Sequence, residues 1–177
     1  MNSIYLTGYL GSGKTTVGSI LSEKLECPFM DTDMEMKNKT GMPVYILYMN
    51  FGESGFRLWE AELLKRTIEQ TNESGQQWVI SCGSGTPVRQ ENTDRLKEQK
   101  NVVFLEGDLN TFFERVKDDP KRPAAFPHVE NLEERLEMFR EQYENWLPAY
   151  KEQADIIINV DGKTPEQVAD EIIAAVK

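Results

Sequence analysis

Short apolar runs alternate with longer stretches of helical periodicity along the whole chain. Five runs have the length and composition of buried strands, at residues 3–7, 28–31, 78–81, 101–106 and 154–160. The stretches between and after them repeat apolar residues every three or four positions, which predicts helices. These predicted helices cover residues 14–25, 35–72, 88–100, 109–116, 132–150 and 166–176. Strands that alternate with helices predict a five-stranded parallel sheet in a three-layer α/β/α domain.

Two residues are expected to interrupt this pattern. Gly52 suits the C-terminal cap of a helix inside 35–72, and a longer helix begins again near Gly55. Pro148 is expected to kink or stop the last long helix, because proline lacks the amide donor. Residues 117–131 show neither kind of periodicity and carry three prolines and a cluster of charges. A loop of this length in a small domain predicts a mobile lid.

Length and cysteine content limit the class of protein. The 177 residues fit one domain over 1–177. No apolar run approaches the roughly 20 residues of a membrane span, and the chain enters a strand at once, so we expect neither a span nor a signal peptide. Cys27 and Cys82 lie far apart without metal-ligand spacing, which predicts free thiols in a reducing cytoplasm. We expect a cytoplasmic monomer.

The net charge of −10 at pH 7 excludes some partners. Nucleic acids and anionic membranes both need a basic surface, so neither is expected as a partner. An acidic protein that binds an anionic small molecule must gather its few cations at the binding site. The positions of lysines and arginines near glycines and prolines are therefore informative.

The stretch 8–15, Gly-Tyr-Leu-Gly-Ser-Gly-Lys-Thr, fits the phosphate-binding P-loop pattern G-x-x-x-x-G-K-[ST]. A predicted strand precedes it and a predicted helix follows it, which the motif requires and a chance glycine-rich turn would not. Lys14 would reach the β- and γ-phosphates of a nucleotide, and the Thr15 hydroxyl would hold Mg²⁺. The residues predicted to bind nucleotide here are Gly11, Ser12, Gly13, Lys14, Thr15 and Thr16.

Two carboxylates, Asp31 and Asp33, stand at the C-terminal end of the second predicted strand. Ligands of open α/β sheets bind at this end of the strands. One carboxylate would hold a Mg²⁺-bound water, and the other would accept a hydrogen bond from a substrate hydroxyl and could also accept its proton. The alternative is that one of them only caps the next helix.

Missing motifs narrow the choice among P-loop proteins. The third strand runs into Cys82 and Gly83 without the acidic residue that often ends this strand in hydrolysing ATPases. Asn38-Lys39-Thr40-Gly41 lacks the aspartate of a GTPase base-reading motif. Both absences disfavour motor ATPases and switch GTPases and favour a compact kinase.

Other glycines and arginines fall at positions that suit a ligand. Gly83-Ser84-Gly85 follows the third strand, where backbone amides approach a ligand closely, although an ordinary strand-to-helix turn explains it nearly as well. Arg122 in the predicted lid would stabilise transition-state charge. Arg57 and Glu60 are three residues apart, a spacing at which the two side chains could be a mere surface ion pair.

Several motifs together make the chain resemble shikimate kinases over nearly its whole length. Each is weak apart from the P-loop, but their order and spacing are specific. The matching segments are 8–16, Phe29 to Asp33, Gly52 to Glu60, Gly83 to Gly85, Arg122-Pro123, Pro148 to Tyr150 and Ala154-Asp155.

For the nucleotide, the resemblance implies ATP and Mg²⁺ and assigns roles by position. Lys14 would contact the phosphates and Thr15 the Mg²⁺, with Asp31 in the outer shell of the metal. Arg115 would stack on adenine, and Pro165 would lie in the adenine loop.

For the acceptor, the resemblance implies transfer of the γ-phosphate of ATP to the 3-hydroxyl of shikimate. Asp33 would bind the hydroxyls and act as base, and Arg57 would pair with the carboxylate. Arg122 would be the lid arginine, and Gly83, Ser84 and Gly85 would line the acceptor site.

The chain departs from the family pattern at two positions. Ser84 replaces the middle glycine, and Trp146 stands two residues before Pro148, where the family carries a second carboxylate-binding arginine. Arg140 lies six residues upstream of Trp146, about 240° round the helix, and cannot simply replace it. The departures leave open a kinase of another sugar acid or polyol. A nucleotide-binding protein without kinase activity is a third reading, disfavoured by the set Lys14, Thr15, Asp33 and Arg122.

Overall fold

The computed structural model describes residues 2–176 and contains one five-stranded sheet. All strand pairs are parallel and the order is β2-β3-β1-β4-β5, which confirms the predicted sheet. The strands are β1 (Ile4–Gly8), β2 (Phe29–Asp31), β3 (Val79–Ser81), β4 (Val102–Glu106) and β5 (Ile156–Asn159).

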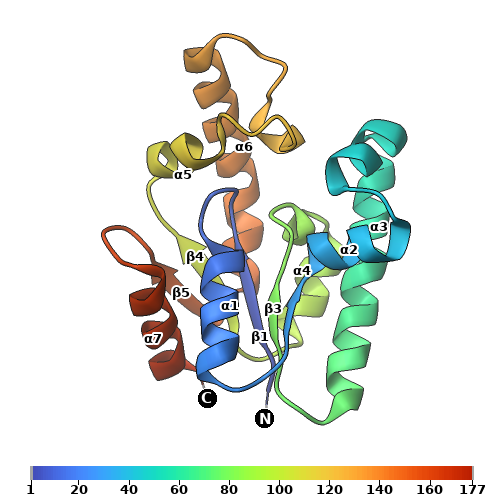
Figure 1. Cartoon of the computed structure of the whole chain (residues 1–177), viewed down its shortest axis with the longest axis vertical. Helices are drawn as coiled ribbons and strands as arrows, with labels where there is room; N and C mark the ends of the chain where they lie inside the picture. The colour runs from blue at the N-terminus through green and yellow to red at the C-terminus, as the bar shows by residue number, and fades with distance from the viewer. Residues whose placement is uncertain (1, 177) are drawn as a thin grey trace.

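Helices cover both faces of the sheet (Figure 1). On one face α1 (Lys14–Lys24) packs against α7 (Pro165–Ala175), and on the other α4 (Gln90–Lys97) packs between α3 (Val44–Ser74) and α6 (Leu132–Gln153). Strand β1 serves both layers because its side chains alternate. Ile4 and Leu6 join the cluster that contains α1, whereas Tyr5 joins the α3 and α4 cluster.

The region predicted to be helical over residues 35–72 is divided between α2 and α3. Helix α2 (Thr32–Thr40) ends at Gly41, and α3 begins at Val44 after Pro43. Gly52 has a non-helical conformation inside α3, with φ 66° and ψ 179°, so two helical segments meet there and the helix end predicted at Gly52 is confirmed. Helix α6 runs through Pro148 to Gln153, so this proline does not stop it. The buried side chains of Trp146 and Tyr150 hold the helix on the core at this point.

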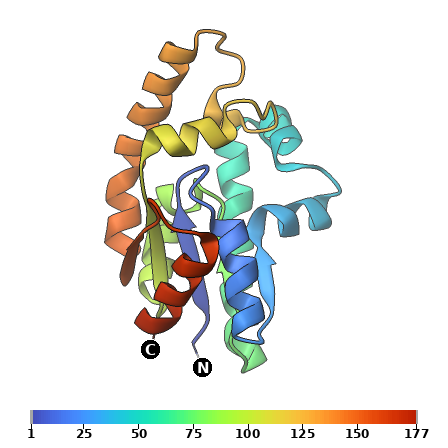
Figure 2. The ribbon, with the colours of Figure 1, turned by 60° about the vertical axis from the view of Figure 1, so that its left-hand side comes forward.

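The sheet order places a ligand crevice at the end of β1. From β1 the chain crosses to β2 and β3 on one side and later to β4 and β5 on the other, which makes this the point where ligands bind in open α/β sheets. Segment 117–131 joins α5 (Leu109–Val116) to α6 and includes one short 3₁₀ turn at Pro123–Ala125. It lies at the same end of the molecule as the loop after β1 (Figures 1 and 2). Within residues 2–176, no helix combines the length and apolarity needed to cross a membrane.

Candidate active site

The loop between β1 and α1 has the backbone of a phosphate-binding loop. Gly11 and Gly13 have φ of 79° and 91°, a conformation that glycine adopts without strain. A side chain at Gly11 would also lie 2.5 Å from the carbonyl oxygen of Phe112, so no larger residue fits there. Helix α1 begins at Lys14 directly after Gly13, so its first amides and the positive end of its dipole face the crevice.

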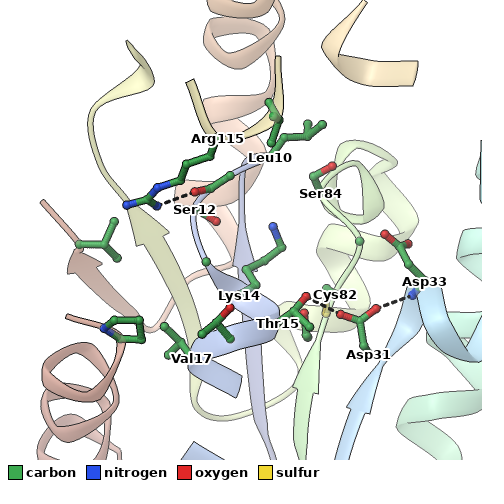
Figure 3. A pocket seen from close by; sticks show the side chains of 18 of the residues that line it. Leu10, Ser12, Lys14, Thr15, Val17, Asp31, Asp33, Cys82, Ser84 and Arg115 are labelled. Atoms are coloured by element: carbon green, nitrogen blue, oxygen red, sulfur yellow. Dashed lines mark hydrogen bonds between the residues drawn. The ribbon is translucent and has the colours of Figure 1, made fainter. Parts of the chain in front are cut away.

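Lys14 and Thr15 occupy the positions that the motif predicts (Figure 3). The Nζ of Lys14 donates to the carbonyl oxygens of Gly8 at 2.7 Å and Tyr9 at 3.0 Å, which holds the ammonium under the loop. Burial lowers the pKa of Lys14 to about 8, although Asp33 and Asp31 act in the opposite direction. The Thr15 hydroxyl donates to Oδ2 of Asp31 at 2.7 Å.

Asp31 both caps a helix and contacts the P-loop threonine. While Oδ2 accepts from Thr15, Oδ1 accepts from the backbone amides of Asp33 at 3.0 Å and Met34 at 3.2 Å. Asp31 is therefore the N-cap of α2 as well as a neighbour of the P-loop threonine. Capping and ligand binding were alternatives from sequence, but one carboxylate with two oxygens can do both.

Asp33, on the first turn of α2, is a half-buried carboxylate beside Lys14. Burial and then the neighbouring charge of Asp31 raise the pKa of Asp33 to about 6, while Lys14 and Arg122 oppose the rise. A carboxylate with this pKa is ionised near neutral pH yet close enough to titration to accept a proton. These are the properties of a base.

Arg57 and Glu60 form a buried pair, which excludes the surface ion pair that spacing alone allowed. Arg57 is 8% exposed and Glu60 is 4% exposed. Nη1 of Arg57 contacts Oε2 of Glu60, and Nη2 lies 3.8 Å from Oε1 of Glu53. Burial raises the pKa of Glu60 to about 7 against the opposing effect of Arg57. This carboxylate therefore depends on the guanidinium for its charged state.

The glycines after β3 let this pair approach the backbone. A Cβ at Gly85 would lie 1.9 Å from Nη1 of Arg57, and a Cβ at Gly83 would lie 2.8 Å from Oδ1 of Asp33 and 3.0 Å from Oε1 of Glu60. A side chain at either position would therefore displace these charged groups. The middle residue, Ser84, presents its carbonyl oxygen to the hydroxyl of Tyr150 on α6 at 2.5 Å.

Trp146, which stands where the family carries a second arginine, lies against the guanidinium of Arg57. Its ring centroid is 5.3 Å from Cζ of Arg57, within the range of a cation–π contact. The indole also meets the ring of Tyr9 edge-on, with centroids 5.5 Å apart at 84°. Arg140, which pairs with Glu137 at 3.1 Å, lines neither of the cavities described next.

Two adjoining cavities meet at the P-loop. The nucleotide cavity has a volume of about 480 Å³. It is lined by the six P-loop residues predicted to bind nucleotide, by Arg115, Pro165 and the lid residue Arg122, and by Gly83 and Ser84. The acceptor cavity, of about 460 Å³, contains Arg57 and Gly85. The lining residues common to both cavities are Leu10, Thr15, Asp31, Asp33, Ser84 and Arg122. Gly83, predicted for the acceptor, lines the nucleotide side.

The other two arginines predicted for the site, Arg115 and Arg122, lie at its edges. Nη1 of Arg115 donates to the carbonyl oxygen of Gly11 at 2.7 Å, so this side chain lies along the edge of the P-loop (Figure 3). Arg122 is half exposed and pairs with Asp119 at 3.1 Å in the 117–131 segment. Pro165 begins α7 and closes the far side of the nucleotide cavity.

Sequence reasoning missed part of the acceptor cavity wall. Its aromatic and basic lining residues include Tyr45, Tyr48, Phe56, Lys37 and Lys121. Apart from Phe56, which lies in the matching segment Gly52 to Glu60, no motif marks them. The reason is that α2 and the first turns of α3 fold over the cavity from a stretch that reads only as amphipathic helix. The position of Lys37, one helical turn after Asp33, was the available signal.

A parallel α/β sheet, a P-loop after its central strand and a carboxylate that faces the loop define a P-loop phosphotransferase with a small-molecule acceptor. A model of the shikimate kinase family matches residues 10–177. The chain belongs to the shikimate kinase family, and it is a phosphotransferase that acts on an alcohol group and uses ATP.

Individual relatives agree over the full length. The chain is 38% identical to a shikimate kinase of Thermodesulfovibrio yellowstonii over 98% of its own length and 94% of the relative. It is 35% identical to a shikimate kinase of Persephonella marina over the whole of both chains. Among solved structures, shikimate kinase from Acinetobacter baumannii in complex with shikimate superposes with a TM-score of 0.88 at 31% identity, over 98% of this chain and 91% of that one.

Proposed function

We propose that this protein transfers the γ-phosphate of ATP to the 3-hydroxyl of shikimate. One observation carries the proposal. The phosphate end of the nucleotide cavity opens into the acceptor cavity at Thr15, Asp33 and Arg122, so a γ-phosphate and an acceptor hydroxyl would meet beside a base and two cations. The family of the chain supports the same reaction.

In the proposed reaction, Asp33 accepts the proton of the attacking hydroxyl while Lys14 stabilises the charge that develops on the phosphoryl oxygens. Arg122 adds a second positive charge when residues 117–131 cover the cavity and exclude water. The pKa values of Asp33 and Lys14, about 6 and about 8, keep both groups charged near pH 7.

The residues near the phosphates suit Mg²⁺ as the ion that accompanies ATP. Thr15 and Asp31 offer oxygen ligands, which Mg²⁺ prefers, and residues 2–176 contain no cluster of three or more His, Cys, Asp or Glu that would form a metal cage. Mg²⁺ is typically held by one or two such protein groups plus phosphate and water. When bound, it would neutralise charge on the β- and γ-phosphates.

For the acceptor, Arg57 is the proposed anchor of the carboxylate. Glu60, Trp146 and Gly85 fix its guanidinium in one position, so little entropy is lost when a ligand binds. The proposal includes a cytoplasmic monomer; the free thiols Cys27 and Cys82 support the reducing compartment.

One observation favours a second candidate. Trp146 stands where the family pattern has an arginine, so the acceptor meets one fewer cation. A kinase of another hydroxylated acid or polyol, with a weaker need for a carboxylate, would fit such a site.

The test is ADP release in a coupled assay with Mg-ATP over a wide range of shikimate concentration. Saturable turnover that disappears in Lys14→Ala and Asp33→Asn is expected. Lys24→Ala is the matched control, because Lys24 lies at the other end of α1 and pairs with Asp170 on the surface. A protein that binds ATP but shows no turnover with shikimate would contradict the proposal, and turnover with other sugar acids or polyols would establish the second candidate.

A further inference from the structure

The acceptor cavity contains four cations, of which two already have acidic partners. Arg57 pairs with Glu60 and Glu53, and Arg122 pairs with Asp119. The other two, Lys37 and Lys121, line the same cavity and form no ion pair within residues 2–176. A carboxylate that enters this cavity would therefore meet positive charge beyond Arg57.

Lys37 is the better placed of these two lysines. It lies four residues after Asp33 on α2, hence on the same face of the helix and roughly 6 Å further along its axis. Asp31 caps the start of this helix, and Gly41 ends it with a hydrogen bond to the carbonyl oxygen of Lys37. The base and this ammonium are thus carried at a fixed separation on one rigid element.

The neighbours of Lys37 indicate the kind of acceptor it faces. Between α2 and Arg57 the cavity wall consists of Pro43, Val44, Tyr45, Tyr48 and Phe56. Tyr48 and Phe56 pack with ring centroids 5.6 Å apart, and the guanidinium of Arg57 lies over the ring of Phe56 at 5.5 Å. This wall suits the apolar face of a ring, with hydroxyls at Asp33 and a carboxylate at the cations.

Lys121 differs from Lys37 in its support. Both lysines are exposed, but Lys121 lies in the irregular segment 117–131, next to Arg122, rather than on a helix, and its backbone amide donates to Asp119 at 2.9 Å. Its ammonium has no rigid relation to Asp33 or Arg57. Arg140, the remaining cation considered for this role, lies outside the cavity.

We infer that Lys37 supplies the second positive charge for the acceptor carboxylate, in place of the arginine that Trp146 replaces. The inference rests on the proposed function. Lys37 binds the carboxylate together with Arg57 and takes no part in proton or phosphoryl transfer. It is a determinant of acceptor specificity.

The test compares Lys37→Gln with Lys39→Gln on two acceptors, shikimate and its methyl ester. Lys39 is the matched control, because it lies on the same helix but pairs with Glu35 at 3.4 Å outside the cavity. For shikimate, Lys37→Gln is expected to raise KM about tenfold, since a hydrogen bond to a charged group is lost at an exposed position. Its kcat and its KM for ATP should stay close to those of the control.

The ester separates a charge contact from a general effect. It keeps the ring and hydroxyls but has no negative charge, so Lys37→Gln and Lys39→Gln are expected to have equal KM values for it. Adding Trp146→Arg to Lys37→Gln should recover KM for shikimate, because it returns a cation to the position of the family arginine.

Three results would overturn the inference. The first is a KM for shikimate in Lys37→Gln equal to that of Lys39→Gln. The second is an equal rise in KM for shikimate and for the ester in Lys37→Gln. The third is a tenfold rise in KM for shikimate that appears in Lys121→Gln instead. Failure of the proposed function is distinguishable, because the unmodified protein would then show no shikimate turnover, and the inference would fall with it.

Discussion

Replacing Gly85 by alanine should weaken binding of the acceptor, and it should do so only by displacing the side chain of Arg57. The φ of Gly85 is −89°, which alanine adopts without strain, so any effect must come from the added methyl group. That methyl would lie 1.9 Å from Nη1 of Arg57, and an ordinary contact begins near 3.4 Å. The guanidinium must therefore withdraw by at least about 1.5 Å, which disturbs its present contacts with Glu60 and Trp146.

Two quantities should change. Overpacking of a well-packed interior costs about 1–3 kcal/mol, so the free energy of unfolding should fall by that amount in a urea titration. Displacing the carboxylate anchor removes a charged contact worth about 1.5–3 kcal/mol, which corresponds to a rise of roughly 10- to 100-fold in KM for shikimate. The KM for ATP should stay the same, because Gly85 does not line the nucleotide cavity.

A double-mutant cycle isolates the cause. In an Arg57→Ala background the added methyl has room, so Gly85→Ala should cost little further stability and little further KM. The steric reasoning would be refuted if Gly85→Ala lowered stability and raised KM equally with and without Arg57→Ala. It would also be refuted if Gly85→Ala alone matched the unmodified protein in the urea titration and in the KM for shikimate.

Four further predictions concern the charges and contacts of the site. The pH profile of kcat/KM should rise through about 6 as Asp33 loses its proton and fall beyond about 8 as Lys14 loses its own; a flat profile from pH 5 to 9 would contradict these roles. The pKa of Asp33 is raised in the folded protein, so its ionised form opposes folding above pH 6. The inactive variant Asp33→Asn lacks this charge and should therefore melt at a higher temperature than the unmodified protein at pH 8, measured by scanning calorimetry. Arg115→Ala should raise KM for ATP about tenfold and leave KM for shikimate unchanged in the coupled assay, since it removes a charged contact at the P-loop edge. Tyr150→Phe should lower the free energy of unfolding by about 1 kcal/mol in urea, because the carbonyl of Ser84 loses its 2.5 Å hydrogen bond.

The features that could be predicted from the sequence are those that depend on local sequence patterns. Strand periodicity and the P-loop motif determine the sheet, the crevice and the placement of Lys14 and Thr15, because backbone geometry there depends on residues close in sequence. The environment of Arg57 could not be predicted in the same way. Its partners Trp146 and Gly85 lie 89 and 28 residues away, and only tertiary packing brings them to it. For the same reason spacing alone could not tell a buried Arg57–Glu60 pair from an exposed one.

The double use of Asp31 limits which residues this position can accept during evolution. An alanine would remove both the helix cap and the partner of Thr15, whereas an asparagine would keep a capping oxygen and lose only the charge. A lineage that lost the charge at this position could therefore pass through asparagine without unwinding the helix that carries Asp33. Mutational tolerance at position 31 is set by the shape of the side chain as well as by its charge.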